Sequence, residues 1–523
     1  MKLKHMKKIR VIISLFFLLF LTLFFLGFTG IFPENFIKGV VSLQFIPSIL
    51  KFFKVFSWIA AGFIVVLILT LLFGRVYCST ICPLGILQDV ISYISKKAKI
   101  RKKYKYLKAI NWLRYSFLGL ALIFLLSGSI LVIALLDPYS LFGRIISDLF
   151  RPLLIEGNNL LAGLLNQFDV YAMYKIDLVS LHIEVLLIPI IFLGLIIWMS
   201  LKKGRLYCNT ICPVGTFLGF LSKYSLFKIK LDINTCTRCG LCESVCKSGC
   251  INTKEQKIDF TRCVGCFNCF TVCPFSSVVF KRTALPKIFK EHTDKNEATA
   301  DKSKRNFIAG IGLMLSSLPF LSKAQELVSY NANKPVKRNN PVTPPGAEST
   351  EKFNNACTAC HLCVNACPTQ VLQPAVLEYG LRGLMQPRMD YHAGFCNFEC
   401  TICSEICPTG AILPILLKDK KLTQLGKVNF VKENCIVETE GTDCGSCAEH
   451  CPTQAVHMVD YENNLRIPEV NQDICTGCGA CEYACPTHPY KAIYVEGNPV
   501  HLRAKKPKQK ELDEVEHEDD FPF

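Results

Sequence analysis

The stretch that decides the fold is CTRCGLCESVC at residues 236–246, followed by CVGCFNCFTVCP at residues 263–274. Each stretch spaces four cysteines as C-x2-C-x2-C-x3-C. Six groups of four, with this or a similar spacing, account for 24 of the 29 cysteines. A disulfide framework fits such dense runs of cysteine poorly, and zinc ribbons usually show two C-x2-C pairs. The groups therefore predict [4Fe–4S] clusters, about six in all.

The first two groups predict a two-cluster ferredoxin module over residues 223–281. In such ferredoxins the fourth cysteine of each run binds the other cluster. One cluster is therefore expected to be held by Cys236, Cys239, Cys242 and Cys273. The other is expected to be held by Cys263, Cys266, Cys269 and Cys246. Cys250 lies outside both sets and is interpreted as a buried free thiol, with replacement of Cys246 as a ligand as the alternative.

Four more groups predict a four-cluster module over residues 353–505. Their cysteines are Cys357, Cys360, Cys363 and Cys367; Cys396, Cys400, Cys403 and Cys407; Cys435, Cys444, Cys447 and Cys451; and Cys475, Cys478, Cys481 and Cys485. Every group ends in Cys-Pro, which turns the chain after the last ligand. The spacing does not predict which groups exchange their fourth ligand.

The first 222 residues predict a four-helix membrane domain. Half of the chain is apolar, and the apolar residues concentrate in this region. A spanning helix needs about 20 mostly apolar residues. The segments that meet or approach this length are Val11–Thr29, Val55–Phe73, Ser116–Leu136 and Val185–Leu201. They are apolar on all sides, whereas helices of a soluble bundle would carry an amphipathic stripe, so contact with membrane lipid is expected.

The basic residues predict the orientation in the membrane. The net charge of +17 does not indicate nucleic-acid binding, because much of the excess lies in short loops beside apolar runs. The N-terminal stretch MKLKHMKKIR and the loop at residues 96–108 are rich in Lys and Arg. Both are therefore expected in the cytoplasm, which also places the two-cluster module there.

An internal repeat lies at the ends of two apolar segments. GRVYCSTICPLG at residues 74–85 matches GRLYCNTICPVG at residues 204–215 at nine of twelve positions. The repeat predicts a duplicated two-helix unit with a C-x3-C-P pair in each copy. Its thiols are Cys78, Cys82, Cys208 and Cys212. Residues four apart share one face of a helix, so these thiols could ligate a metal, form redox-active dithiols, or pack in the core.

Residues 304–324 have the layout of an export signal, with a basic front and a modest apolar core. The pair Lys304–Arg305 resembles a twin-arginine signal in which lysine replaces the first arginine. A membrane anchor and a buried helix are the alternatives. An export signal would place the four-cluster module outside the cytoplasm. The expected connections are a charged linker at 282–303, a flexible linker at 325–352 and a disordered tail at 506–523.

These motifs carry a family resemblance. The first 280 residues resemble membrane ferredoxins of the NapH and MauN type, and residues from about 304 onward resemble exported four-cluster ferredoxins of the NapG and MauM type. The resemblance implies a fusion of the two in a bacterial inner membrane. It also implies electron flow from the quinol pool to a periplasmic reductase or cytochrome. The expected fold is an α-helical membrane bundle plus α+β bacterial-type ferredoxin modules.

The chain is expected to be an electron-transfer subunit without a substrate-reducing site of its own. It has no phosphate loop or Rossmann fingerprint. A quinol dehydrogenase activity would need a proton acceptor near a membrane face, and the candidates at the outer face are Asp137, His182 and Glu184. These residues could instead mark helix ends, and the quinol could bind near the cytoplasmic cysteine pairs. The alternative function is an assembly factor that reduces a metal or thiol of a client enzyme.

Overall fold

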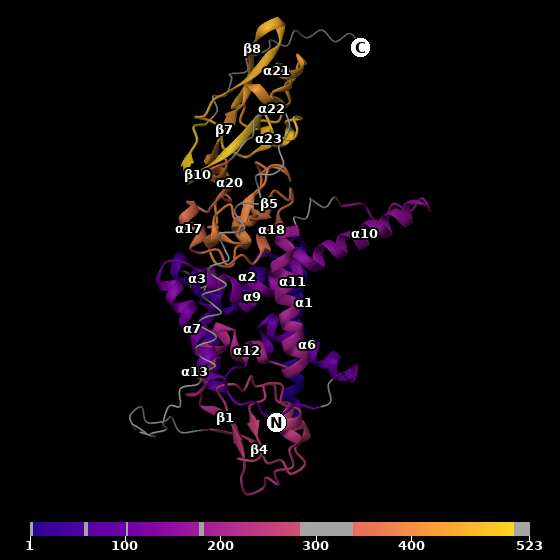
Figure 1. Ribbon diagram of the computed structural model, residues 1–523, viewed down its shortest axis with the longest axis vertical. Coiled ribbons are helices and arrows are strands. Elements are labelled where there is room, and N and C mark those ends of the chain that lie inside the picture. The colour runs from indigo at the N-terminus through magenta and orange to yellow at the C-terminus, as the bar shows by residue number, and fades with distance from the viewer. Residues whose placement is uncertain (1–3, 57–60, 101–102, 177–182, 283–337, 507–523) are drawn as a thin grey trace, which may run out of the picture.

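The computed structural model describes residues 4–56, 61–100, 103–176, 183–282 and 338–506 (Figure 1). These residues form a column with a layer of helices in the middle. The first ferredoxin module lies at one end, beside the N-terminus, and the second lies at the opposite end. His182, the signal-like segment 304–324 and the tail from residue 507 onward lie outside the described residues, as does nearly all of the predicted charged linker.

The helical layer is built from two long helices and many short ones. Its elements are α1 (Lys4–Phe25), η1 (Phe28–Ile31), α2 (Glu34–Ser42), α3 (Phe45–Val55), α4 (Gly62–Phe73), α5 (Tyr77–Thr80), α6 (Pro83–Lys97), α7 (Asn111–Leu126), α8 (Leu131–Leu136), α9 (Pro138–Arg144), the π-helical η3 (Ile145–Phe150), α10 (Arg151–Asn166), α11 (Ile183–Lys203), α12 (Leu206–Thr210) and α13 (Pro213–Ser222). Among the described residues, α1 and α11 are long and apolar enough to cross a membrane. The pair α2 and α3, bent by 108°, is a third candidate if it counts as one broken span.

Two of the four predicted spans differ from the structure. Only part of the predicted span Val55–Phe73 is a described helix, the twelve-residue α4, which is about 18 Å long. The predicted span Ser116–Leu136 is broken, because α7 ends at Leu126 and α8 begins at Leu131. Gly128 lies in the break with φ 76°, the left-handed conformation that commonly ends a helix. Apolar composition alone did not reveal this glycine stop.

The two copies of the repeat form interlocked helical units. Each consists of a longer helix, a short helix and a third helix that begins at the proline of the C-x3-C-P motif: α4, α5 and α6 in the first copy, and α11, α12 and α13 in the second. The last helix of each copy packs on the long helix of the other, since α6 contacts α11 and α13 contacts α4. The duplicated unit is therefore one structure with exchanged helices.

Reciprocal arginines join the two copies. Nη2 of Arg75 donates to the carbonyl oxygen of Cys208 at 2.9 Å, and Nη1 of Arg205 donates to the carbonyl oxygen of Cys78. Both side chains are buried. Each guanidinium passes a glycine of the other copy: a Cβ on Gly85 would lie 2.7 Å from Arg205 Nη1, and a Cβ on Gly215 would lie 2.8 Å from Arg75 Nη2. The arginine, the first cysteine and the last glycine of each repeat copy thus take part in one contact between the copies.

Helix α1 connects the two ends of the column. Its 22 residues extend over about 33 Å. It contacts α15 (Asn268–Val272) of the first module and α18 (Leu362–Ala366) of the second. Met6 packs against the core of the first module. At the other end the carbonyl oxygen of Phe25 accepts a hydrogen bond from Nδ2 of Asn365 at 2.6 Å. The two modules are therefore separated by the length of a membrane-spanning helix.

The first module consists of two antiparallel strand pairs with two short helices. Its elements are β1 (Phe227–Leu231) paired with β4 (Val278–Arg282), β2 (Ile251–Asn252) paired with β3 (Lys257–Ile258), α14 (Leu241–Ser244) and α15 (Asn268–Val272). Phe227 stacks on Phe73 of α4 with ring centroids 5.7 Å apart, and on Phe280 at the same distance. This aromatic stack fixes the strand pair β1–β4 to the end of α4.

The second module contains three antiparallel strand pairs and short helices. Its elements are α17 (Thr350–Asn354), α18 (Leu362–Ala366), β5 (Leu372–Pro374) paired with β6 (Pro387–Met389), η5 (Leu381–Gly383), α19 (Ile402–Ile406), α20 (Leu417–Lys420), β7 (Thr423–Phe430) paired with β10 (Ile493–Arg503), η6 (Lys432–Asn434), α21 (Ile436–Glu440), α22 (Ser446–Glu449), β8 (Val456–Asp460) paired with β9 (Arg466–Val470), η7 (Glu462–Asn464) and α23 (Ala480–Ala484). Residues 338–352 were predicted to belong to a flexible linker, yet Val342, Thr343 and Ala347 are buried in this module.

A single buried carboxylate ties the first module to the helical layer. The side chain of Asp89 on α6 forms ion pairs with Arg205 at 2.8 Å, with Arg10 of α1 at 3.1 Å and with Lys247 of the first module at 3.3 Å. Three cations thus converge on one anion. Because removal of one partner from a buried ion pair leaves uncompensated charge, this carboxylate is expected to be far more important than a surface acid.

We expect Asp89→Asn to destabilise the protein by about 3–5 kcal/mol, because the buried Arg10 and Arg205 and the partly buried Lys247 would lose their counter-ion. The midpoint of thermal unfolding of the detergent-purified protein measures the effect. Glu34→Gln is the matched control, since Glu34 pairs with Lys38 on an exposed helix face, where such a pair contributes about 0–1 kcal/mol. Equal midpoints for the two variants would contradict the role given to Asp89.

We expect Gly85→Ala and Gly215→Ala each to destabilise the protein by about 1–3 kcal/mol, the usual cost of forcing an extra methyl group into a packed core. The added Cβ would lie 2.3 Å from the carbonyl oxygen of Cys78 or Cys208, respectively. Gly194→Ala on α11 is the control, because a Cβ there meets nothing within 4 Å. A decrease in the unfolding midpoint for Gly194→Ala as large as those for the other two would show that the interlock is not the cause.

Candidate iron–sulfur sites

The first candidate site is a cavity in the first module. Its lining includes the four cysteines predicted as one ligand set, Cys236, Cys239, Cys242 and Cys273. The first three lie around the start of α14, and the fourth follows α15. The structure thus brings together thiols from both runs, as the predicted exchange of the fourth ligand requires.

The second candidate site contains one more thiol than a cluster needs. Cys269 lies within electrostatic range of Cys266, Cys263 and Cys246, which completes the predicted set. Sγ of Cys250 lies 3.5 Å from Sγ of Cys246, and Cys250 also interacts with Cys263. Cys250 is therefore buried beside the ligand set, within reach of the position that Cys246 occupies.

In the second module, the fourth cysteine is exchanged between the first and second groups and between the third and fourth. Two cavities show the exchange directly. One is lined by Cys396, Cys400, Cys403 and Cys367. The other is lined by Cys435, Cys444, Cys447 and Cys485. The remaining two sets, judged by their electrostatic neighbours, are Cys357, Cys360, Cys363 and Cys407, and Cys475, Cys478, Cys481 and Cys451. The structure thus indicates which groups exchange their fourth cysteine, which the spacing did not predict.

The backbone around the second cysteine recurs in four of the six groups. The residues on either side of that cysteine both have positive φ. The pairs are Arg238 and Gly240, Gly265 and Phe267, Ala359 and His361, and Gly477 and Gly479. Left-handed residues of this kind turn successive N–H groups into a concave surface that suits an anionic iron–sulfur site. The two groups with a longer first gap lack this pair among their described residues.

Metal binding at the cysteine groups must displace protons from buried thiols. Burial raises the pKa of the Cys242 thiol to about 11 and that of Cys475 to about 11, so both are protonated at neutral pH when no metal is bound. Metal binding must release these protons and replaces them with positive charge. A bound [4Fe–4S] cluster supplies a one-electron carrier at each site.

The four sites of the second module follow one another away from the helices. The Cys360 group is nearest to them, because a Cβ on Gly143 of α9 would lie 2.4 Å from the carbonyl oxygen of Cys360. The N–H of Cys396 donates to the carbonyl oxygen of Cys478 at 2.9 Å, so the second and fourth groups are neighbours. The spatial order of the groups is therefore first, second, fourth and third.

The first module turns its second site toward the helices. Cys266 is buried in the same apolar core as Cys82 and Cys212, and a Cβ on Gly265 would lie 3.3 Å from a methyl carbon of Val76. In the other site of this module, Cys239 is exposed. The first module thus has one site at the helical layer and one near solvent.

The four repeat thiols lie in the helical layer between the modules. Cys78, Cys82, Cys208 and Cys212 are all buried, and Cys82 lies within electrostatic range of the other three. Among the described residues, no three His, Cys, Asp or Glu side chains are close enough to hold a single metal ion. The same holds for the ferredoxin groups, whose thiols would surround a cube. The structure thus brings the four thiols of the two C-x3-C-P pairs into one part of the helical layer.

The quinol candidates are not in equivalent positions. Asp137 is buried, and its carboxylate caps α9 by accepting hydrogen bonds from the backbone N–H and the hydroxyl of Ser140, at 2.9 and 2.8 Å. Glu184 lies exposed in the first turn of α11, and His182 lies outside the described residues. Asp137 thus marks the beginning of a helix, which was the alternative interpretation of this residue. The side chain of Glu184 is exposed.

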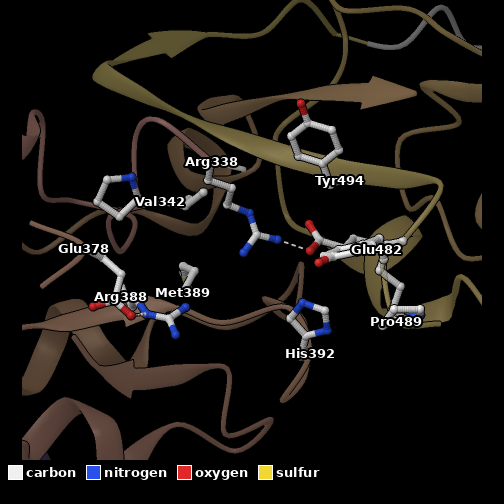
Figure 2. A pocket seen from close by; sticks show the side chains of 12 residues that line it. Arg338, Val342, Glu378, Arg388, Met389, His392, Glu482, Pro489 and Tyr494 are labelled. Carbon is white, nitrogen blue, oxygen red and sulfur yellow. Dashed lines mark hydrogen bonds and ion pairs between the residues drawn. The ribbon is translucent and has the colours of Figure 1, made fainter. Parts of the chain in front are cut away.

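A cavity of about 340 Å³ lies in the second module beside the cysteine groups, since Met389 lines both this cavity and the one that contains Cys396 (Figure 2). Its charged side chains are engaged with one another. Arg338 forms an ion pair with the buried Glu482 and donates to the carbonyl oxygen of Val495 at 3.1 Å, and Arg388 pairs with Glu378 at 2.8 Å. These contacts attach the segment beginning at Arg338 to the rest of the module and explain why it is folded.

Family models match the cysteine-bearing regions. Residues 55–102 and 185–234 match a 4Fe-4S binding domain. Residues 356–412 and 442–488 match two models of a 4Fe-4S dicluster domain. No solved structure matches the chain.

Several curated proteins are similar to parts of the chain. The methylamine utilization ferredoxin-type protein MauM of Methylophilus methylotrophus is 33% identical over 158 residues, 28% of this chain and 66% of that protein. The uncharacterized protein MJ0750 of Methanocaldococcus jannaschii is 26% identical over 291 residues, 53% of this chain and 96% of that protein. The ferredoxin-type protein NapG of Escherichia coli is 33% identical over 197 residues, 34% of this chain and 80% of NapG. Together with the cysteine groups, these matches place the chain in the family of iron–sulfur ferredoxin-type proteins that includes NapG.

Proposed function

We propose that this protein carries electrons across a membrane through iron–sulfur clusters at both ends of a helical layer. The observation that carries the proposal is the position of the two modules. They contact opposite ends of α1, a helix with the length and apolar composition of a membrane span. If α1 and α11 cross the bilayer, the two modules face different compartments.

The spatial order of the cysteine groups supports a single path. It begins at the group that contains the exposed Cys239 and continues through the Cys266 group at one end of the helices. It resumes at the Cys360 group at the other end and proceeds outward through the second module. The protein's part in this path is to hold each site at a fixed distance from the next and to exclude water.

The helix α10 supports contact with lipid. It projects sideways from the column where the helical layer meets the second module (Figure 1). Leu153, Leu160 and Leu164 along it are exposed, whereas Asn158 and Asn159 donate to backbone carbonyls of the following segment. A helix with one apolar and one polar face at this level suits the boundary between headgroups and acyl chains.

We infer that the two halves are a NapH/MauN-type membrane ferredoxin fused to a NapG/MauM-type exported ferredoxin. The protein would lie in a bacterial inner membrane, with the first module cytoplasmic and the second periplasmic. It would draw electrons from the quinol pool and deliver them to a periplasmic reductase or cytochrome. The basic residues support this orientation, because the N-terminus and the basic loop before α7 lie at the end that carries the first module.

The first prediction from this function concerns topology. Protease added to spheroplasts is expected to remove the second module, residues 353–505, and to leave the first module, residues 223–281, intact until the membrane is permeabilised. Immunoblots against a tag at each module give the readout. Protection of both modules in intact spheroplasts would place all the clusters on one side and would contradict transfer across the membrane.

The second prediction concerns the quinol. Of the three candidates, the exposed Glu184 is best placed to accept a proton from a bound quinol. Glu184→Gln is expected to slow quinol-driven cluster reduction in proteoliposomes at least tenfold, an effect of about 1.4 kcal/mol on the barrier, while dithionite still reduces all clusters. Glu156→Gln, an exposed acid on α10, is the control and should reduce its clusters at the wild-type rate.

Asp137→Asn and His182→Gln complete the quinol series. If all the variants match the wild type, the outer-face site is wrong and the quinol site belongs near the cysteine pairs at the cytoplasmic end. Clusters that quinol never reduces, but that reduce a metal or thiol of a client enzyme, would favour the alternative function of an assembly factor.

A further inference from the structure

The outer face of strand β1 carries lysines that have no acidic partner. Lys228 and Lys230 alternate along the strand with the buried Ile229 and Leu231, so both lysines point away from the core of the first module. Neither of them forms an ion pair within the part of the chain that the structure describes, and the same is true of Lys223, which follows α13. This face is therefore a patch of positive charge that no carboxylate compensates.

The positive charges of this patch lie close together. Lys228 is directly opposite Lys281 of β4 in the register of the strand pair, and like charges in this arrangement destabilise a sheet. Burial, together with the neighbouring charges of Lys230 and Lys223, lowers the pKa of Lys228, so the ammonium groups repel one another. An anion bound between them would relieve this repulsion.

The patch lies at the ends of two apolar helices. The N–H of Leu226 donates to the carbonyl oxygen of Leu71 in the last turn of α4 at 2.8 Å. Nζ of Lys228 donates to the carbonyl oxygen of Lys223 at the end of α13, at 2.6 Å. The side chain of Lys228 is thus turned back toward the helical layer, and Figure 1 shows β1 where this layer meets the first module.

Both helices beside the patch expose apolar side chains. These are Val65, Ile68 and Leu71 on α4, and Phe217 and Phe220 on α13. The two helices pack against each other, and the ring of Tyr224 follows α13 with its centroid 5.9 Å from that of Phe220. Apolar helix, tyrosine and lysines thus follow one another in the order of acyl chains, membrane interface and headgroups.

We propose that the outer face of β1, with Lys223, Lys228 and Lys230, binds the phosphate headgroups of anionic phospholipids in the leaflet around α4 and α13. The inference rests on the proposed function, in which the helical layer crosses a membrane. A lipid fits this surface better than an acidic protein, because an acyl chain covers the exposed apolar side chains while its headgroup contacts the ammonium groups. Headgroups bound here hold the first module against the membrane surface.

The first test measures the reactivity of the lysines themselves. The full-length protein is inserted into nanodiscs of phosphatidylcholine, with or without phosphatidylglycerol, acetylated briefly at its amines and analysed by mass spectrometry. Lys228 and Lys230 are expected to react several-fold more slowly when phosphatidylglycerol is present. The internal controls are Lys254 and Lys257, which are exposed at the strand pair β2–β3. They should react equally in both, because Gln256 between them contacts Cys236 at the site near solvent.

A second measurement compares two double variants of equal net charge. Lys228→Gln/Lys230→Gln is expected to weaken the binding of phosphatidylglycerol to the detergent-purified protein by about 30-fold, as counted by native mass spectrometry during a lipid titration. Lys254→Gln/Lys257→Gln should bind it as the wild type does. The EPR signals of the ferredoxin clusters report that each variant is folded.

The outcomes separate this inference from the function on which it rests. Equal acetylation of Lys228 and Lys230 in both kinds of nanodisc, or equal lipid affinity of the two double variants, would overturn the lipid site and leave the proposed function intact. Protection of the two lysines by inorganic phosphate in discs of phosphatidylcholine alone would overturn it as well, because the patch would then bind a free anion. A protein that does not insert into nanodiscs at all would overturn the proposed function, and this inference with it.

Discussion

The architecture depends on two arginines that cross between the copies of an internal repeat. Each guanidinium donates to the carbonyl oxygen of the first cysteine in the other copy, and each passes over a glycine that has no room for a Cβ. Either copy alone would expose a buried charge and an unfilled groove. The helices α6 and α13 are exchanged between the copies for the same reason, because only the paired arrangement satisfies both arginines. The positions of the four thiols follow from this contact rather than from their own chemistry.

The two arginines of this contact differ in whether a carboxylate compensates their buried charge. Arg205 shares Asp89 with Arg10 and Lys247, so a single carboxylate anchors the first helix and the first module to the second copy of the repeat. In the part of the chain that the structure describes, Arg75 has no such acid. A pair of repeats that is nearly identical in sequence thus differs in its electrostatic balance. That asymmetry is informative because neutral oxygens satisfy hydrogen bonds but do not compensate a charge.

Much of this organisation could be predicted from the sequence, and the failures have physical causes. The cysteine groups, the repeat and the two-ended arrangement follow from local spacing and apolar composition. The predicted span Ser116–Leu136 fails because Gly128 ends a helix within an apolar run, which composition cannot detect. The buried environment of Asp137 also could not be predicted, because its electrostatic neighbours Tyr77, Tyr207 and Cys360 are distant from it in the sequence. The ligand exchange within the second module likewise depends on packing between groups.

Specific buried hydrogen bonds hold the second module against the helices. Nδ1 of His361 lies 2.8 Å from a carboxylate oxygen of Asp148, and Nε2 lies 2.8 Å from the carbonyl oxygen of Met385. Asn365 donates to the end of α1 and to Ser147. These polar groups are buried and satisfied only in one docking geometry, because any shift would leave them unpaired without water. An apolar interface could slide by several ångströms at little cost. Since His361 and Asn365 belong to the Cys360 group and its helix, the same polar contacts that orient the module also fix how far its first site lies from the thiols in the helical layer.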